Sequence, residues 1–166
     1  MTTTPAPAEV SRLDGGKLRV TRRFNAARDL VWRSFTRPDL VKRWMEGDPA
    51  WQMTLCEMDV REGGTFSWRW KQNDGPGEFG FHGTYHEVTA PHRIVNDEYY
   101  DPGTLGGSMG DYCDLVITFE ETDGVTLMTN TMDFHTEANR ETAMSTGMSD
   151  GMEISYQLLD RLLTEG

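Results

Sequence analysis

The sequence predicts an α+β fold in which a curved antiparallel sheet of six to seven strands wraps around one long C-terminal helix. Apolar and polar residues alternate sharply over Thr65–Lys71, which is typical of a strand with one buried face. The segment from Met144 to Leu163 carries one regular apolar stripe at helical spacing. A sheet with a single apolar face must bury that face, and the last helix is the element long enough to cover it. Because a strongly twisted sheet rarely closes completely on one helix, we expect residual space between them.

The other elements follow from hydrophobic periodicity and turn residues. Strands are expected at Lys17–Phe24, Met53–Val60, Thr65–Lys71, Glu78–Val88, Arg93–Tyr100, Cys113–Glu120 and Val125–Phe134. Two short helices are expected between the first two strands, and Pro38 suits the first turn of the second helix. The C-terminal helix is expected from Asn139 to Leu163. Residues 1–16, rich in Thr, Pro and Ala, are interpreted as a flexible tail before a single domain over residues 17–166.

Composition excludes several classes of partner. A chain of 166 residues is long enough for one hydrophobic core, and its net charge of −11 disfavours nucleic acid and anionic membranes. There is no apolar run long enough to span a bilayer, and the N-terminus does not resemble a secretory signal. We therefore expect a cytoplasmic protein in which Cys56 and Cys113 are reduced and packed.

Two patterns that resemble functional motifs do not support the chemistry they suggest. His82 and His86 lie on one strand, roughly 13 Å apart at about 3.3 Å per residue, so they cannot share a metal ion. Alternation also places both on the outer face. Gly106–Gly110 matches G-x-S-x-G, but it lies between antiparallel strands rather than at a strand-to-helix turn of a parallel sheet. We interpret the Gly-rich loop at 101–110 as a lid, with Leu105 and Met109 able to cap an apolar ligand.

Five short motifs in order carry a resemblance to a known superfamily. They are Leu30-Val31-Trp32 with Thr36-Arg37-Pro38 and Arg43-Trp44, then Asp59 to Phe66, His82 to Val88, Pro91 to Val95 and Gly147 to Gly151. From about Leu18 to Leu163 the chain resembles the START-like (helix-grip, SRPBCC) superfamily. The branch it resembles is the bacterial family related to the C-terminal domain of the activator of the heat-shock-protein-90 ATPase. The resemblance implies the helix-grip fold with a cavity between sheet and helix, and implies much less about activity.

The chain departs from the family pattern at positions that affect this cavity. Met152 stands where the family usually has Trp, so a flexible thioether replaces a rigid indole and should widen the pocket. Asn96, Glu98 and Asn130 fall at inward-facing strand positions, where relatives more often have apolar residues. We therefore expect one polar wall and an amphipathic ligand rather than a plain hydrocarbon.

The candidate ligand-binding residues are those that strand and helix alternation turns toward this space. They are Trp44, Phe66, Trp68, Trp70, Phe81, Tyr85, Asn96, Glu98, Met128, Asn130, Met132, Met148, Met152 and Tyr156. Any one of them could be ordinary core, but Trp and Tyr have polar tips that need a partner when buried. No metal or cofactor is expected.

Three functions remain open at this point. The leading prediction is a protein that binds a small hydrophobic or amphipathic molecule. The first alternative is an enzyme of the cyclase, dehydratase or hydrolase type, in which a desolvated Glu98 acts as acid or base beside Tyr85 or Asn130. The second alternative, by analogy with the eukaryotic relative, is a chaperone-regulating interaction module. A homodimer is compatible with all three.

Overall fold

The computed structural model describes residues 4–165, which form eight strands and four α-helices. The strands are β1 (Glu9–Leu13), β2 (Lys17–Phe24), β3 (Trp51–Met58), β4 (Thr65–Gln72), β5 (Glu78–Thr89), β6 (Arg93–Asp101), β7 (Cys113–Thr122) and β8 (Val125–Asp133). The helices are α1 (Arg28–Thr36), α2 (Pro38–Met45), α3 (Glu137–Met144) and α4 (Met148–Thr164), with a short 3-10 turn, η1 (Asp14–Gly16), between β1 and β2.

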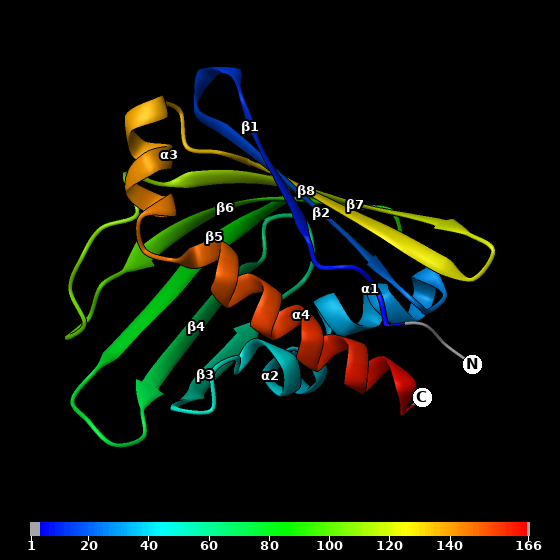
Figure 1. The fold of residues 1–166 in the computed structure, drawn as a ribbon, viewed down its shortest axis with the longest axis horizontal. Coiled ribbons are helices and arrows are strands. Elements are labelled where there is room, and N and C mark those ends of the chain that lie inside the picture. Colours follow the sequence, from blue (N-terminus) through cyan, green and yellow to red (C-terminus); the bar gives the residue numbers. More distant parts are fainter. Residues whose placement is uncertain (1–3, 166) are drawn as a thin grey trace.

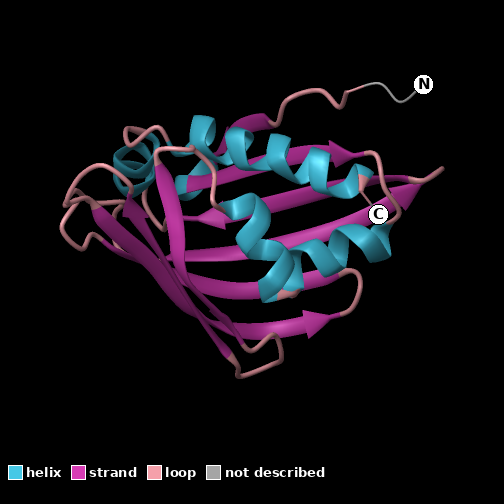
Figure 2. Ribbon diagram, turned by 90° about the horizontal axis from the view of Figure 1, so that it is seen from below, coloured by secondary structure: helices cyan, strands magenta, loops and turns pink. Residues whose placement is uncertain are grey.

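All eight strands form one antiparallel sheet in the order β1-β2-β8-β7-β6-β5-β4-β3. The sheet is strongly curved, and α4 runs across its concave face (Figure 1). The helices gather on one side of the sheet (Figure 2). This arrangement is the predicted α+β helix-grip fold. No helix within residues 4–165 is both long and apolar enough to cross a membrane.

Two predicted boundaries were wrong. Residues 9–13, which we expected in the flexible tail, form β1 and pair with β2, so the sheet gains an eighth strand at this edge. Residues 1–3 of the expected tail lie outside the described residues. The long C-terminal helix is divided into α3 and α4, because Gly147 has a φ of 81° and stands at the N-cap of α4. That left-handed conformation interrupts helical hydrogen bonding and suits Gly.

The strand β5 contains an irregularity in its pairing. A bulge between Tyr85 and Glu87 shifts the register with β6, so both Tyr85 and Val88 pack toward the core. A side chain at Gly83 would meet the backbone oxygen of Asp97 and the ring of Phe66. The absence of a side chain at Gly83 therefore allows β5 and β6 to curve around the space beneath α4.

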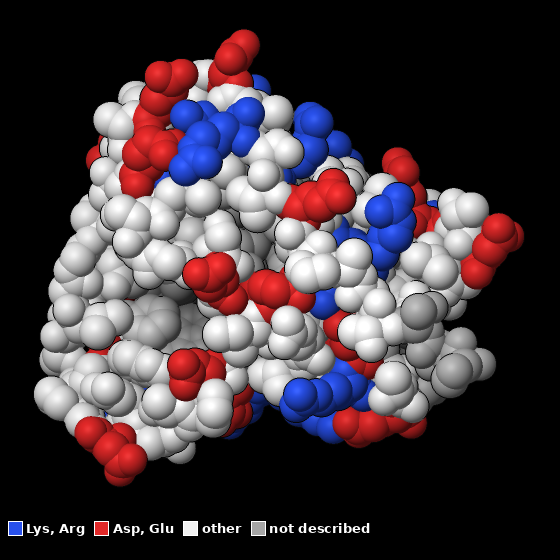
Figure 3. Space-filling view, in the orientation of Figure 1, with Lys and Arg blue, Asp and Glu red and all other residues white. Residues whose placement is uncertain are grey.

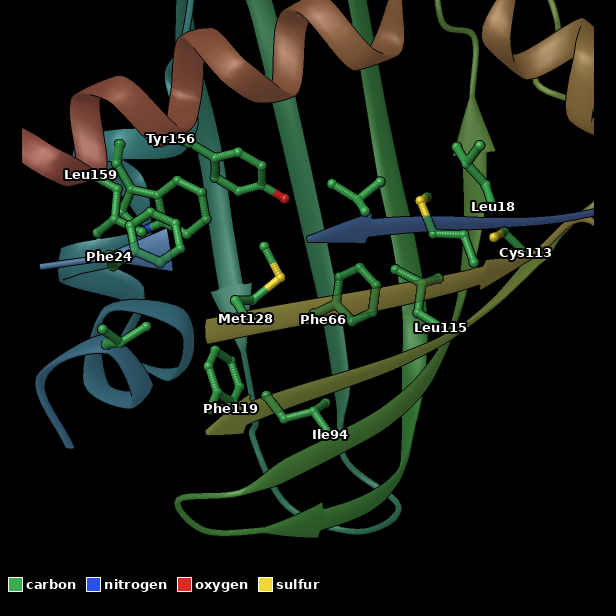
Figure 4. Packing of buried hydrophobic residues seen from close by; sticks show 14 of the residues in the cluster. Leu18, Phe24, Phe66, Ile94, Cys113, Leu115, Phe119, Met128, Tyr156 and Leu159 are labelled. Carbon is green, nitrogen blue, oxygen red and sulfur yellow. The ribbon is translucent and has the colours of Figure 1, made fainter. Parts of the chain in front are cut away.

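Part of the core lies where β2, β7 and β8 meet α1 and α4 (Figure 4). Fully buried side chains there include Phe24, Phe119, Met128 and Leu159. Arg22 lies at an inward position of β2, between Val20 and Phe24, and its side chain is fully buried. Its guanidinium Nη2 lies 3.0 Å from Glu153 Oε2 and 2.8 Å from Asp160 Oδ2, so two carboxylates of α4 neutralise it. This ion pair fastens α4 to the sheet.

Candidate functional site

A cavity of about 590 Å³ lies between α4 and the half of the sheet formed by β3 to β6, and it extends to β7 and β8. In Figure 3 a hollow opens in the surface on this side of the molecule. The volume lies within the range of about 300–1,000 Å³ that is typical of pockets for small ligands. The residual space predicted from the twisted sheet is therefore present in the structure.

One wall of the cavity is aromatic. It is built by Phe66, Trp68 and Trp70 of β4 together with Phe79, Phe81 and Tyr85 of β5. Two of the indoles in the cavity lining are already hydrogen-bonded, since Trp70 Nε1 donates to the Met45 carbonyl and Trp44 Nε1 donates to the Ser34 carbonyl, each at 2.8 Å. These two side chains are fixed parts of the wall.

The opposite part of the sheet supplies the polar wall that the alternation predicted. Asn96 and Glu98 of β6 pair in register with Leu115 and Cys113 of β7, and Asn130 of β8 pairs with Ile117. All of these residues line the cavity. Asn96 Nδ2 donates to the Asp97 carbonyl at 3.0 Å, which fixes its amide. Glu98, Asn96 and Asn130 thus belong to three successive lines of paired residues across the strands, all on the concave face of the sheet.

Glu98 is the carboxylate of this wall. Burial raises the pKa of its carboxyl from the ordinary value of 4.5 to about 7, because the charged form loses hydration. Desolvation is the sole cause, since within residues 4–165 no cationic or hydrogen-bonding side chain compensates the carboxylate. Glu98 is therefore poised to gain or lose a proton near neutral pH.

Several other polar groups around the cavity have no protein partner among the described residues. Trp68 Nε1 and Asn130 Oδ1 are buried without a hydrogen bond. Tyr85 and Tyr156 are each 4% exposed, and burial raises the pKa of both phenols well above the ordinary value, so both are neutral at physiological pH. The Tyr156 hydroxyl extends from α4 toward the sheet (Figure 4). A buried polar group left without a partner costs about 1–3 kcal/mol, which a bound molecule could recover.

The helical side of the cavity is lined by flexible methionine side chains. Met148 and Met152 of α4 line it as predicted, beside Tyr156, whose ring stacks on Trp44 at 6.2 Å. Two unbranched thioethers can adapt to different shapes. Thr146 and Gly147, at the break between α3 and α4, reach the same space.

The mouth of the cavity is acidic and partly covered by a loop. Glu46 and Asp48 follow α2, and Asp111 precedes β7. Leu105 and Met109 of the Gly-rich loop also line the cavity, and Leu105 is 51% exposed. Hydrogen bonds hold the first half of this loop. The backbone N–H groups of Thr104 and Leu105 donate to the Glu78 carbonyl, and the Tyr100 hydroxyl donates to the Gly106 carbonyl at 2.9 Å.

Thirteen of the fourteen predicted site residues line the cavity, and Met128 is the exception. Met128 does face inward, but it is fully buried in the core with Phe24 and Phe119 and does not reach the cavity. Residues that we did not predict as site residues also line the cavity, notably Trp51, Phe79, Tyr100 and the acidic residues of the mouth. Phe79 and Tyr100 share the parity of Phe81 and Glu98, so alternation could have identified them.

We did not predict metal binding by the histidine pair or catalysis by the G-x-S-x-G segment. His82 and His86 are exposed on the outer face, where His82 stacks on Tyr99 and His86 Nε2 lies 2.7 Å from Asp97 Oδ2. In the described part of the chain no three His, Cys, Asp or Glu side chains are grouped to hold a metal ion. The G-x-S-x-G segment lies in the loop between β6 and β7, and no helix follows it.

A curved antiparallel sheet that grips a C-terminal helix around a cavity defines a helix-grip protein of the START-like class. The family described as "Activator of Hsp90 ATPase homolog 1-like protein" matches residues 25–164, and the chain belongs to this family. None of the curated proteins matches the chain.

Solved structures of bacterial proteins share the fold. A protein from Rhodobacter sphaeroides is 24% identical with a TM-score of 0.86, and the match covers 96% of this chain and 99% of that one. A protein from Mycobacterium smegmatis is 22% identical with a TM-score of 0.82, covering 95% and 97%. The AHSA1-like protein from Aeromonas hydrophila is 21% identical with a TM-score of 0.65, covering 87% and 94%. These likenesses establish the fold of the chain alone.

Proposed function

We propose that this protein binds a small amphipathic molecule in the cavity between α4 and the sheet. The observation that carries the proposal is the combination of an aromatic cavity of about 590 Å³ with polar groups that lack protein partners. A site of this kind buries an apolar body and orients one polar end. The polar wall of Asn96, Glu98 and Asn130 supports an amphipathic ligand over a plain hydrocarbon.

Native mass spectrometry of freshly purified protein tests the proposal directly. We expect an added mass that disappears after partial denaturation, together with stabilisation of the protein by apolar probes in a thermal-shift screen. Met152→Trp should fill part of the cavity and weaken both signals. Gln157→Trp adds the same side chain at an exposed position of α4 and serves as the control. Protein that carries no copurified molecule and responds to no apolar probe would contradict the proposal.

A second candidate function is acid–base catalysis on the bound molecule. It is favoured by the convergence of Glu98, Tyr85 and Asn130 on one cavity and by the pKa of Glu98, which lies near 7. A general acid or base works best when its pKa is close to the operating pH. The neutral phenol of Tyr85 could donate a hydrogen bond to a substrate oxygen.

Catalysis is distinguished from binding by incubating the copurified molecule with fresh protein and following its mass. If Glu98 is an acid or base, wild-type protein changes the molecule and Glu98→Gln binds it unchanged. An unchanged molecule after incubation with wild-type protein would leave binding as the function.

The chaperone-regulator alternative is supported by the description of the family and by no particular surface described above, so we do not propose it. A cytoplasmic location and a homodimer stay predictions from the sequence.

A further inference from the structure

The charged residues that line the cavity all have the same sign. They are Glu46, Asp48, Glu98 and Asp111, and the described lining contains no Lys, Arg or His. In Figure 3 the charged atoms that border the hollow are likewise acidic. An anionic ligand such as a fatty acid would enter a negative field without a counter-ion, which is unfavourable in a site that excludes water.

The aromatic wall favours a positive charge as well. The face of an aromatic ring carries partial negative charge, and it attracts a cation that lies within about 6 Å of its centre. Trp68, Trp70 and Phe81 come from adjacent strands and have neighbouring rings, with the Trp70 and Phe81 ring centres 6.0 Å apart. Phe66 packs between Trp68 and Tyr85 and joins Tyr85 to this cluster. An aromatic cluster beside a carboxylate is an arrangement suited to an ammonium group.

Acceptor atoms are available for the hydrogen bonds that an ammonium group donates. Glu98 supplies a carboxylate that no cation among residues 4–165 neutralises. Asn130, which is 6% exposed, has a side-chain oxygen without a donor. The hydroxyl oxygens of Tyr85 and Tyr156 can also accept.

The N-terminal end of α4 disfavours a bound cation, because it contributes partial positive charge. The N-terminal end of α4 borders the cavity at Gly147 and Met148, and a helix N-terminus carries roughly half a positive elementary charge. Asp150 lies in the first turn of α4 and offsets this charge. The balance of charge around the cavity therefore remains negative.

We propose that the cavity selects a cationic amphiphile, in which an amine-bearing end lies between Glu98 and the aromatic wall and an apolar body fills the rest of the space. The proposal rests on the proposed ligand-binding function and specifies the chemical class of the ligand. It assigns Glu98 the role of counter-ion to the bound ammonium group.

Three probes with the same apolar chain and different head groups test this selectivity: decylammonium, decanol and decanoate, each used below its micellar concentration. Binding is measured by isothermal titration calorimetry and by the fluorescence of the cavity tryptophans. We expect decylammonium to bind at least about tenfold more tightly than decanol, and decanoate to bind most weakly. In Glu98→Gln the preference for decylammonium over decanol should fall by about tenfold or more.

Controls separate the head-group effect from folding and from overall charge. Glu120→Gln removes one charge from an exposed position outside the cavity and should leave the preference unchanged. Circular dichroism and the affinity for decanol report whether Glu98→Gln keeps the fold and the cavity.

The pattern of affinities distinguishes two failures. If decanol and decanoate bind as tightly as decylammonium, or more tightly, the proposed cationic class is wrong while the ligand-binding function stands. If none of the three probes binds, the ligand-binding function is overturned and the cationic class with it.

The pH dependence of affinity in the wild-type protein is an independent test. The titratable groups near Glu98 are Tyr85 on β5, Cys113 on β7 and Tyr156 on α4, and burial raises the pKa of each. The carboxylates Glu46, Asp48 and Asp111 line the same cavity. An alkylammonium stays charged near neutral pH, so its affinity should rise from about pH 6 to about pH 8 as Glu98 ionises. Affinity for decylammonium that falls over this interval would contradict the proposal.

Discussion

The two ends of the space beneath α4 are enclosed by the same sheet and the same helix, yet they are filled differently. At one end Phe24, Phe119, Met128 and Leu159 are fully buried in the core, and none of the four lines the cavity. At the other end larger aromatic side chains surround a cavity. The ends also differ in charge, since the buried Arg22 is paired with two carboxylates, whereas Glu98 has no cationic partner in the described part of the chain.

This difference separates residues that hold the fold from residues that are free to act on another molecule. A well-packed core stabilises the fold through contacts within the protein. In the cavity wall, polar groups without hydrogen-bond partners can form their hydrogen bonds with a ligand. Substitutions at the packed end should therefore change stability, and substitutions at the cavity should chiefly change binding. Each prediction below compares the two ends through one kind of substitution.

The largest effect is expected when a large side chain of α4 is shortened at the packed end. Leu159 is fully buried, so Leu159→Ala should lower the free energy of unfolding by about 3–4 kcal/mol. Met152 lies on the same helix but borders the cavity, and Met152→Ala should cost less than about 1 kcal/mol. Urea denaturation of both variants measures the difference, and similar losses would show that the cavity end is packed like the core.

The next effect concerns the paired charge. Arg22→Met leaves Glu153 and Asp160 without their partner and should lower stability by about 2–3 kcal/mol, since both carboxylates keep some contact with water. Arg12→Met breaks an exposed pair with Glu141 and should cost much less, because water solvates both side chains. Chemical denaturation of the two variants at one pH makes the comparison. An equal loss in both would mean that the Arg22 pair does not fasten α4.

Removing the unpaired charge of Glu98 should raise stability, whereas removing the paired charge of Arg22 should lower it. The folded-state pKa of Glu98 is raised, so its contribution to stability is present below its ordinary pKa of 4.5 and is lost as the pH rises through about 7. Glu98→Gln should therefore be more stable than wild type by on the order of 1–2 kcal/mol at about pH 8. At about pH 4, where Glu98 is protonated in the folded protein and mostly protonated in the unfolded chain, the two proteins should be nearly equal in stability. Thermal unfolding across this pH range checks the trend, which a pH-independent difference would refute.

The smallest effect on stability is expected from filling the cavity. Met152→Trp should change the free energy of unfolding by less than about 1 kcal/mol, because the indole enters space that is already present. The same substitution should weaken the binding of decanol by about tenfold or more. Stability and affinity are measured on one preparation, and unchanged affinity would place the ligand elsewhere.

Much of the fold could be predicted from alternation and turn residues, since these signals are local. Phe66, Trp68 and Trp70 alternate with polar residues, and Asp123-Gly124 marks a hairpin that the structure contains between β7 and β8. The strand β1 was missed because its residues are mostly exposed and have no apolar face. The division of the last helix depends on a left-handed Gly147, and sequence pattern alone does not reveal the conformation of one glycine.

Much of the candidate site could also be predicted from the local alternation of apolar and polar residues. Parity places Asn96, Glu98 and Asn130 on the concave face, and the strand register confirms it. Parity does not report how far an inward side chain is from other atoms, so Met128 and Met132 look alike in the sequence although only Met132 reaches the cavity. The acidic mouth was missed because Glu46, Asp48 and Asp111 come from loops that meet only in the folded chain.

The pairing of β2 with β8 has a consequence for the order in which the molecule assembles. Strands β3 to β8 follow one another as neighbours, so each can pair as soon as the next has been synthesised. By contrast, β2 must wait for a strand from the far end of the chain, and Ala8 N donates to Glu153 Oε1 of the last helix at 2.8 Å. Contacts so distant in sequence form late and slowly. In a nascent chain the concave apolar face of the sheet would therefore stay exposed until α4 has been synthesised. The cavity, which α4 and the sheet enclose, would be the last part of the protein to form.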